Sequence, residues 1–599
     1  MTVSAANTLW ARSIVDELAR AGVRELVVAP GSRSTPVVLA AAADGRLKLR
    51  VHLDERSAAF FALGVGKAAG RPAAVLTTSG TAVANLLPAV VEASESGVPL
   101  LVLTADRPPR LRGADANQAI DQAGIFGDFV RESFDPGPPS LDGPALRHLR
   151  GVAARAVAAS VSAAGPGPGP VHLNLPFDKP LEPVEPPADF VEAHPLAATG
   201  RPDGAPFVRI STARAIAADA RLDEVAALFA GGDACGVIVA GPLEEAARVG
   251  PAVVALGEAT GWPVLADPLS GARFGRAGDA HVVAGYDLFL DDPGVRERLA
   301  PSVIVRVGAT PTSASLQRWI LDHNGVPHVV LDAHGRWKDS GATATQVLRA
   351  DAADALWRLA ERVRTGSGTE AAEWADEWRA LWRRADEAAR RVTAARVPGH
   401  EGDLAGRVVE ALDVGTTLVV SSSMPVRDVD GYAHPADRGL EVLGNRGASG
   451  IDGVVSTAFG VASQRDAPTV CLIGDVAFFH DRNGLLWSRE ADASVVFVLI
   501  DNDGGGIFHM LPVSEHEPHF TPLFATPHGL DPRAVIESHG IGFVETTDES
   551  LTESVRAAVK AGGSVVIHVR TDREENRSHH RATLDAVAGE VRAALAEPD

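Results

Sequence analysis

The chain has 599 residues, of which 46% are hydrophobic, and it carries a formal net charge of −21. This length allows three or four domains of ~150 residues each. The acidic balance argues against a nucleic-acid-binding protein, which needs a basic face. The two cysteines, Cys235 and Cys471, lie far apart, which argues against a disulfide framework or a zinc site. No apolar run reaches the ~18 residues of a membrane span, so we predict a cytoplasmic protein.

Short apolar runs alternate with helical stretches along the whole chain, which predicts an α/β protein with parallel sheets. The first domain is expected over residues 1–185, with strands at 25–29, 47–53, 73–77, 100–104 and 171–175. After the first strand comes the turn PGSRSTP, which contains Ser32 and Arg33. A strand-to-helix turn with a hydroxyl, a guanidinium and backbone N–H groups is suited to bind a carboxylate or phosphate. Simple helix capping is the alternative.

Three later turns of this domain also carry polar residues. Glu55 follows the second strand, where an acid in the first helical turn is favoured by the helix dipole without any further role. Gly80 lies in a turn of small residues that would allow a flat ligand to approach the backbone. Arg107 precedes two prolines at a strand end, as either an anion contact or a surface charge.

A stretch rich in proline, alanine and glycine, residues 183–208, is expected to be a linker. The second domain is predicted over 209–365, with strands at 236–240, 263–266, 302–307 and 328–331. Its small-residue turn at 308–313 does not read GxGxxG, which argues against a flavin or NAD site. Residues 368–395 are predicted to form a helical connector.

The third domain is predicted over 400–585. An apolar run at 469–473 ends at Asp475, and a second run at 495–500 leads to Asn502 and three glycines. Two such runs with a helix between them predict a βαβ unit, so both polar residues would lie at the carboxyl ends of neighbouring strands. These oxygen ligands suit Mg²⁺ with a diphosphate, and an ordinary solvated turn is the alternative. The scattered histidines, including His509, His528 and His579, lack the spacing of metal ligands.

Three α/β units with Gly-Asp and Asn 27 positions apart in the last one resemble the thiamine-diphosphate enzymes, although Val476 departs from their Gly-Asp-Gly motif. Within that group the chain resembles the MenD-type enzymes, the 2-succinyl-5-enolpyruvyl-6-hydroxy-3-cyclohexene-1-carboxylate synthases of menaquinone biosynthesis. Seven motifs carry this resemblance: APGSRSTP (29–36), DERSAAFFALG (54–64), TTSGTAVANLLPAVVEA (77–93), LTADRPP (103–109), ANQAIDQ (116–122), GNRGASGIDG (444–453) and DNDGGGIF (501–508).

The resemblance implies a pyrimidine-binding first domain, a central domain, and a third domain that binds diphosphate and metal. It implies thiamine diphosphate as cofactor, with Mg²⁺ or Mn²⁺ held by Asp475, Asn502 and the carbonyl of Gly504. Glu55 would hydrogen-bond the aminopyrimidine and Ile507 would hold the two rings bent toward each other. The remaining implied cofactor contacts are Gly80, Ile451 and Phe508.

The implied reaction is decarboxylation of 2-oxoglutarate and 1,4-addition of the succinyl carbanion to isochorismate, which makes the enzyme a transferase. Both substrates are dianions, and the planar fork of arginine suits carboxylates. The resemblance implies nine catalytic residues. Glu55 acts on the cofactor, and the other eight are substrate contacts: Ser32, Arg33, Arg107, Asn117, Gln118, Ser423, Arg427 and Arg446. The resemblance also implies a homodimer at least, and a homotetramer by preference, with active sites at the subunit interface.

Two alternatives stay open at this point. One is another thiamine-diphosphate enzyme, such as a relative of acetohydroxyacid synthase or pyruvate oxidase. The absent flavin signature and the arginine-bearing motifs argue against it. The other is a cofactor-binding homologue without catalytic activity, which would be expected to lack Glu55 or Asp475, and both are present.

Overall fold

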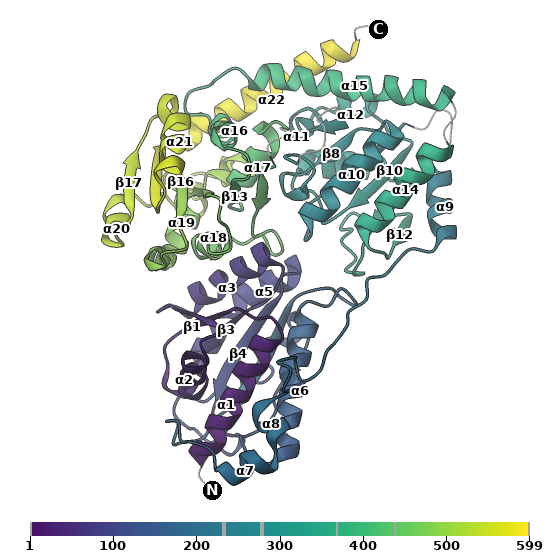
Figure 1. Ribbon diagram of the computed structural model, residues 1–599. Helices are drawn as coiled ribbons and strands as arrows, with labels where there is room; N and C mark the ends of the chain where they lie inside the picture. Colours follow the sequence, from purple (N-terminus) through teal and green to yellow (C-terminus); the bar gives the residue numbers. More distant parts are fainter. Residues whose placement is uncertain (1–2, 230–234, 276–280, 367–368, 436–438, 597–599) are drawn as a thin grey trace. The chain divides into compact units, whose positions relative to one another are not determined.

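The computed structural model describes residues 3–229, 235–275, 281–366, 369–435 and 439–596. Within them lie three six-stranded sheets in which every strand pair is parallel (Figure 1). This confirms the expected α/β class with three parallel-sheet domains. None of the described helices combines the length and the apolar character that a membrane crossing requires. By its contacts the chain divides into two compact units, which are described in turn.

The first unit comprises residues 1–213, 445–466 and 480–494. Its sheet has the order β2-β1-β3-β4-β6-β5. Helices α1, α2 and α6 pack together on one face, and α3 and α5 lie on the other. The bounds are β1 (Glu25–Val28), β2 (Lys48–Val51), β3 (Ala73–Thr77), β4 (Leu100–Asp106), β5 (Ser133–Phe134), β6 (Pro170–Pro176), α1 (Val3–Arg20), α2 (Thr35–Asp44), α3 (Glu55–Ala69), α4 (Thr81–Ala84), α5 (Leu87–Ser96) and α6 (Gly143–Ser160).

One expectation for this unit needs correction. The stretch 183–208 is not a plain linker, because it contains α7 (Ala188–Ala193) and α8 (Pro195–Thr199), and α8 packs on α6. The segment after β3 forms two helices, α4 and α5. The second of them starts with Pro88 in its first turn, where a proline ring is tolerated because its missing N–H has no helical partner.

Helix α3, which begins at Glu55, packs closely on α18 (Val454–Ala462). Glycines make this approach possible. A Cβ added at Gly64 would lie 2.3 Å from the carbonyl oxygen of Thr457, and one at Gly460 would lie 2.1 Å from that of Phe61. The two backbones therefore touch at the middle of α3.

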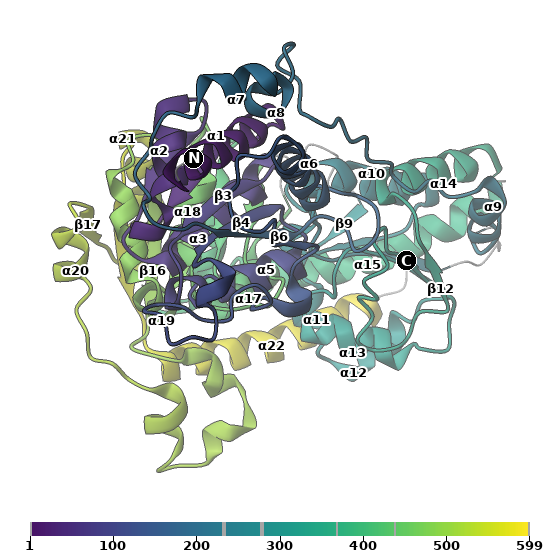
Figure 2. The same cartoon turned by 90° about the horizontal axis from the view of Figure 1, so that it is seen from below.

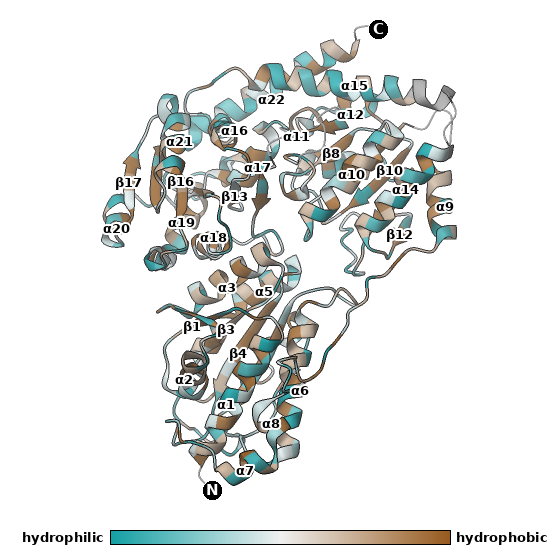
Figure 3. Ribbon diagram, in the orientation of Figure 1, coloured by the Kyte–Doolittle hydropathy of each residue, from teal (hydrophilic) through white to brown (hydrophobic). Residues whose placement is uncertain are grey.

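The second unit contains the other two sheets. Its C-terminal sheet, β14-β13-β15-β16-β18-β17, repeats the strand order of the first unit. The central strands of the sheets are hydrophobic along their length (Figure 3). The bounds are β13 (Thr417–Val420), β14 (Glu441–Leu443), β15 (Thr469–Gly474), β16 (Val495–Asp501), β17 (Gly542–Glu545), β18 (Val565–Arg570), α16 (Glu401–Ala411), α17 (Met424–Tyr432), α19 (Asp475–His480), α20 (Arg533–Ser538), α21 (Leu551–Ala561) and α22 (Arg573–Ala596).

The middle sheet has the order β12-β11-β10-β7-β8-β9, which is the order of dinucleotide-binding sheets. Ligands bind such sheets between the first and fourth strands, here β7 and β10. At that point the two backbones lie close together, since a Cβ on Gly241 would lie 1.9 Å from the carbonyl oxygen of Ala309.

The remaining elements of the second unit complete its layers. The long helices α15 and α22 pack along each other (Figures 1 and 2). The bounds are β7 (Gly236–Ala240), β8 (Val264–Ala266), β9 (Val282–Val283), β10 (Val303–Val307), β11 (His328–Leu331), β12 (Gln346–Leu348), α9 (Asp219–Ala227), α10 (Ala246–Thr260), α11 (Tyr286–Phe289), α12 (Pro293–Arg298), α13 (Ala314–Asp322), α14 (Ala352–Gly366) and α15 (Thr369–Thr393).

Candidate active site

The PGSRSTP turn leaves β1 and enters α2 through a single 3-10 turn, Ser32–Ser34. Arg33 is buried, and its Nη1 donates a hydrogen bond to the carbonyl oxygen of Phe177 at 2.9 Å. Ser32 is exposed beside it. The turn lies against the end of β3, since a Cβ on Gly31 would be 2.3 Å from that of Thr78.

Arg107 follows β4 and is also buried. Its backbone N–H donates to Asp106 Oδ1 at 2.7 Å, and its Nη1 donates to the hydroxyl of Ser79. Burial lowers the pKa of both Arg33 and Arg107, and for Arg33 the nearby positive charge of Arg107 lowers it further. Two neighbouring, partly desolvated guanidinium groups favour binding of an anion between or beside them.

Gly80, Asn117 and Gln118 lie at the neighbouring turn. Gly80 is buried with φ of 83°, and a Cβ there would lie 2.8 Å from Gln118 Cγ. The Gln118 amide donates to the carbonyl oxygen of Ser79 at 2.8 Å, and the Ser79 hydroxyl donates back to the carbonyl oxygen of Gln118 at 3.0 Å. Asn117 is exposed. Ser79 thus connects Gln118 with Arg107.

Gln122, the last residue of the ANQAIDQ motif, packs against this turn and was not predicted as a site residue. Its side chain is buried, accepts from the Gly80 N–H at 3.4 Å and donates to Asn174 Oδ1 at 2.9 Å. It therefore supports the backbone of Gly80.

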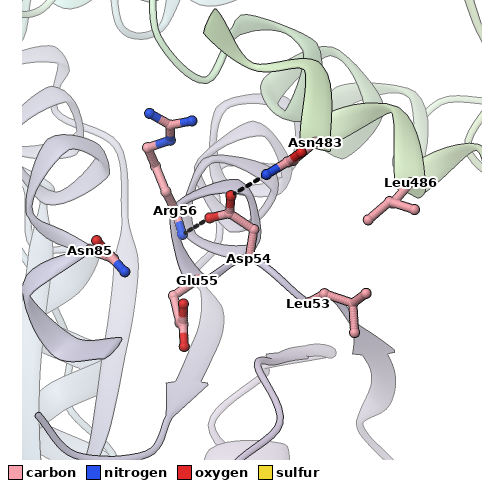
Figure 4. A pocket seen from close by; sticks show the side chains of 7 residues that line it. All are labelled: Leu53, Asp54, Glu55, Arg56, Asn85, Asn483 and Leu486. Atoms are coloured by element: carbon pink, nitrogen blue, oxygen red, sulfur yellow. Dashed lines mark hydrogen bonds between the residues drawn. The ribbon is translucent and has the colours of Figure 1, made fainter. Parts of the chain in front are cut away.

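Glu55 is half-buried and lines a cavity of about 500 Å³. Six further residues line it: Leu53, Asp54, Arg56, Asn85, Asn483 and Leu486. Asp54 caps α3 by accepting from the Arg56 N–H at 2.9 Å, and it accepts from Asn483 Nδ2 at 2.9 Å (Figure 4). The Glu55 carboxylate points away from this pair, so it is available to a ligand in the cavity.

Arg446 and Ile451 belong to the first unit and are half-buried, but neither lines the cavity around Glu55. Their loop is held by the buried carboxylate of Glu92, which accepts from the backbone N–H groups of Gly447 and Ala448 at 3.0 and 2.8 Å. No spacing in the sequence pointed to Glu92, because it lies more than 350 positions away.

In the second unit, β15 and β16 pair in parallel with Gly474 opposite Ile500. This confirms the predicted βαβ unit and places Asp475 and Asn502 at neighbouring strand ends. Asp475 is buried, and its Oδ2 accepts from the Gly504 N–H at 2.7 Å. Burial, followed by the negative charge of Asp501, raises the pKa of Asp475 above its usual range, and a bound cation would offset both effects.

Asn502 is buried, and its Nδ2 donates to Glu401 Oε1 at 2.8 Å. Its Oδ1 is also buried, without a hydrogen-bond partner among the described residues. The Gly504 carbonyl accepts from the Gly506 N–H at 3.0 Å and keeps a second lone pair. A buried carboxylate, an unsatisfied amide oxygen and a carbonyl fit a hard divalent cation.

His528 reaches the same place, although its sequence spacing gave no sign of it. Its Nε2 lies 3.1 Å from Asp475 Oδ2, and ligand atoms of Asp475, Asp501 and His528 lie within 4.8 Å of one another. Asp501 also contacts His568, with 2.8 Å between Asp501 Oδ2 and His568 Nε2. In this arrangement the His528 imidazole occupies one side of the Asp475 carboxylate.

Ser423 and Arg427 lie at the start of α17, beyond the carboxyl end of β13, which neighbours β15. Arg427 Nη1 donates to the Ser423 carbonyl oxygen at 2.7 Å, and Ser423 has φ of 75°. Ile507 and Phe508 follow Asn502 in the 3-10 turn Gly506–Met510 and are half-buried. These residues share the strand-end edge that carries Asp475.

Comparisons with known proteins agree with this arrangement. Three family models match: the N-terminal TPP binding domain of thiamine pyrophosphate enzymes over residues 10–125, the middle domain over 213–415, and the C-terminal TPP binding domain over 431–569. Curated relatives named 2-succinyl-5-enolpyruvyl-6-hydroxy-3-cyclohexene-1-carboxylate synthase come from several organisms. One from Halobacterium salinarum is 46% identical over 98% of this chain and 100% of its own. One from Rubrobacter xylanophilus is 43% identical over 98% and 99%.

Proposed function

The chain belongs to the 2-succinyl-5-enolpyruvyl-6-hydroxy-3-cyclohexene-1-carboxylate synthases, thiamine-diphosphate-dependent transferases of menaquinone biosynthesis, and we propose that the residues described above are its active site. The similarity over nearly the whole length of both chains carries this proposal. The reaction joins 2-oxoglutarate, with loss of CO₂, to isochorismate. When bound, thiamine diphosphate supplies the nucleophilic carbon and the electron sink for the decarboxylation.

We propose that the first unit binds the pyrimidine end of the cofactor. Glu55 faces the cavity and would hold a proton on the aminopyrimidine by a hydrogen bond. Gly80, supported by Gln122, offers a backbone that a flat ring can approach, and Ile451 would contact the ring from its loop.

The second unit would bind the diphosphate through Mg²⁺ or Mn²⁺, with Asp475 Oδ1 or Oδ2, Asn502 Oδ1 and the Gly504 carbonyl as ligands. The unsatisfied oxygen of Asn502 supports this assignment. A metal bound through Asp475 Oδ2 would displace His528 from that oxygen. Ile507 and Phe508 would supply the apolar wall against the cofactor rings, which excludes water from the reacting carbon.

The two dianionic substrates need fixed positive charge. Arg33 and Arg107, close together and buried, are proposed to bind substrate carboxylates, with Ser32, Asn117 and Gln118 as hydrogen-bond partners. Arg427, Arg446 and Ser423 would complete the set.

We further propose a cytoplasmic homodimer or homotetramer in which one subunit supplies Glu55 and another supplies the metal site. The domain bounds 1–185, 209–365 and 400–585 remain predictions.

The test is a direct assay of isochorismate consumption. Purified protein with Mg²⁺, thiamine diphosphate, 2-oxoglutarate and isochorismate should consume isochorismate, measured by its absorbance, and release CO₂. Glu55→Gln should lower kcat by about 10²-fold or more, since proton transfer by a positioned group contributes 10²–10⁴-fold. Turnover of pyruvate without consumption of isochorismate would instead identify a different thiamine-diphosphate enzyme.

A further inference from the structure

We propose that Glu401 is a positioning residue for the metal site: it fixes the orientation of the Asn502 amide so that the amide oxygen faces the cation. The inference rests on the proposed metal site. Glu401 has no assigned role, and it lies 101 positions before Asn502 in the sequence.

Glu401 is the first residue of α16 and is only 3% exposed. Its Oε1 accepts two hydrogen bonds, from Asn502 Nδ2 at 2.8 Å and from Thr571 Oγ1 at 2.8 Å. Its backbone N–H donates to Asn576 Oδ1 at 3.0 Å. The carboxylate is thus held in one position from two directions before any ligand binds.

A carboxylate oxygen accepts hydrogen bonds, whereas an amide presents a donor on one side and an acceptor on the other. With Glu401 on the NH₂ side, the Asn502 oxygen must point away from it, and that oxygen is the buried atom without a partner. The reversed amide would set two acceptor oxygens against each other. Gly506 leaves the required room, since a Cβ there would lie 2.5 Å from Asn502 Nδ2.

The backbone around Asn502 is anchored independently of Glu401. Arg573 Nη1 donates to the carbonyl oxygens of Asn502 and Asp503, each at 2.8 Å. Loss of the Glu401 acceptor should therefore release the side-chain amide while leaving the loop in place. Partners that orient metal ligands in this way affect metal affinity by about 10–100-fold.

The experiment measures Mn²⁺ affinity of the full-length protein with thiamine diphosphate present, by the loss of the free Mn²⁺ signal in electron paramagnetic resonance. Glu401→Leu, which keeps the size but removes the acceptor, should weaken Mn²⁺ binding by about 10–100-fold. Glu401→Gln, whose amide oxygen can accept both hydrogen bonds, should stay within about threefold of wild type. Thr571→Val removes the other donor and is the matched control, with the same threefold limit.

Glu401→Asp is the second variant, because it keeps the charge but withdraws the acceptor by one methylene. Glu401→Asp should weaken Mn²⁺ binding by about tenfold. It supplies the test if Glu401→Leu does not fold. Wild-type affinity in Glu401→Asp or in folded Glu401→Leu, or a Gln variant as weak as the Leu variant, would overturn the inference alone. Absence of Mn²⁺ binding by the wild type would overturn the metal site and the inference together.

Discussion

Arg33 and Arg107 occupy buried positions with few anionic partners. Arg33 donates to a carbonyl oxygen and Arg107 to a hydroxyl, and burial lowers the pKa of each. A guanidinium kept out of water gains most from a charged acceptor, and a dicarboxylate supplies two. Arg33 and Arg107 are therefore better suited to bind an anionic ligand than to stabilise the protein without one.

We expect Arg33→Ala and Arg107→Ala each to lower kcat/KM by an amount that corresponds to about 2–5 kcal/mol, mostly through a higher KM for one of the two dianions. The measurement is steady-state kinetics with each substrate varied in turn. Arg110→Ala is the control, because Arg110 is exposed and pairs with Asp178 on the surface. If both buried variants keep their KM values, the arginines do not bind substrate carboxylates.

Whether a site residue can be predicted from the sequence depends on how far along the chain its contact partners lie. Asp475 and Asn502 were predictable because each follows an apolar strand directly, and parallel neighbours bring such positions together. Glu401 and Glu92 were not, because their partners lie 101 and more than 350 positions away and no local pattern encodes such contacts. The positions of the predicted substrate residues relative to a bound substrate also stay predictions.

At the scale of elements, the contact of α3 with α18 holds in place the helix that begins at Glu55. The buried carboxylate of Asp481 accepts from the Ser456 N–H of α18 at 2.7 Å and from the Ser57 hydroxyl of α3 at 3.2 Å. It therefore connects the first turns of the two helices. Burial raises the pKa of Asp481 to about 6. The carboxylate contacts α3 in its first turn and the two glycine contacts lie at its middle, so both hold the helix that begins at Glu55.

Gly460→Ala should destabilise the first unit by about 1–3 kcal/mol, because the new Cβ would lie 2.1 Å from the Phe61 carbonyl oxygen and the helices must separate. Thermal unfolding followed by circular dichroism measures this. Gly151→Ala, inside α6 with nothing within 4 Å of its Cβ, is the matched control and should stabilise by about 0.5–1 kcal/mol. Equal Tm shifts of the same sign in both variants would contradict a tight helix contact.

Five strands at the edges of their sheets were not predicted from the sequence: β5, β9, β12, β14 and β17. Each is two to four residues long, and β17 is largely exposed. Central strands are buried on both faces and read as continuous apolar runs, whereas edge strands need no such run. Apolar runs therefore made central strands predictable, whereas five of the six edge strands, all except β2, were missed.

At the scale of the whole molecule, buried histidines make stability depend on pH. Burial lowers the pKa of His172 and His328 to about 4, of His434 to about 4 and of His400 to about 3, from 6.5. Because the unfolded chain binds these protons first, stability is full above pH 6.5 and falls as the pH drops from 6.5 toward 4.

We expect His172→Gln to reduce this acid sensitivity in the first unit. The fall of its pKa from 6.5 to about 4 corresponds to a loss of about 3 kcal/mol of stability over this pH range. Urea unfolding of wild type and variant across pH 4–8 measures the difference. The variant should be less stable than wild type near pH 7.5, where it loses the contact with Thr104, and should approach it near pH 4. A constant difference at all pH values would show that His172 does not titrate in this window.

The proposed shared active site makes a prediction about mixed subunits. Glu55→Gln and Asp475→Asn each remove one necessary group, the first from the pyrimidine side and the second from the metal site. If one subunit supplies Glu55 and the other Asp475, a dimer with one copy of each variant contains one site with both defects and one with neither. Random reassembly of the two inactive variants, after mild dissociation and dialysis, should then restore about a quarter of wild-type activity, since half of the dimers are mixed and each has one intact site. If both groups came from the same chain, every site would carry one defect and no activity would return.

Co-expression of the two variants with different affinity tags, followed by purification through both tags, isolates the mixed dimer, which should have about half of wild-type activity.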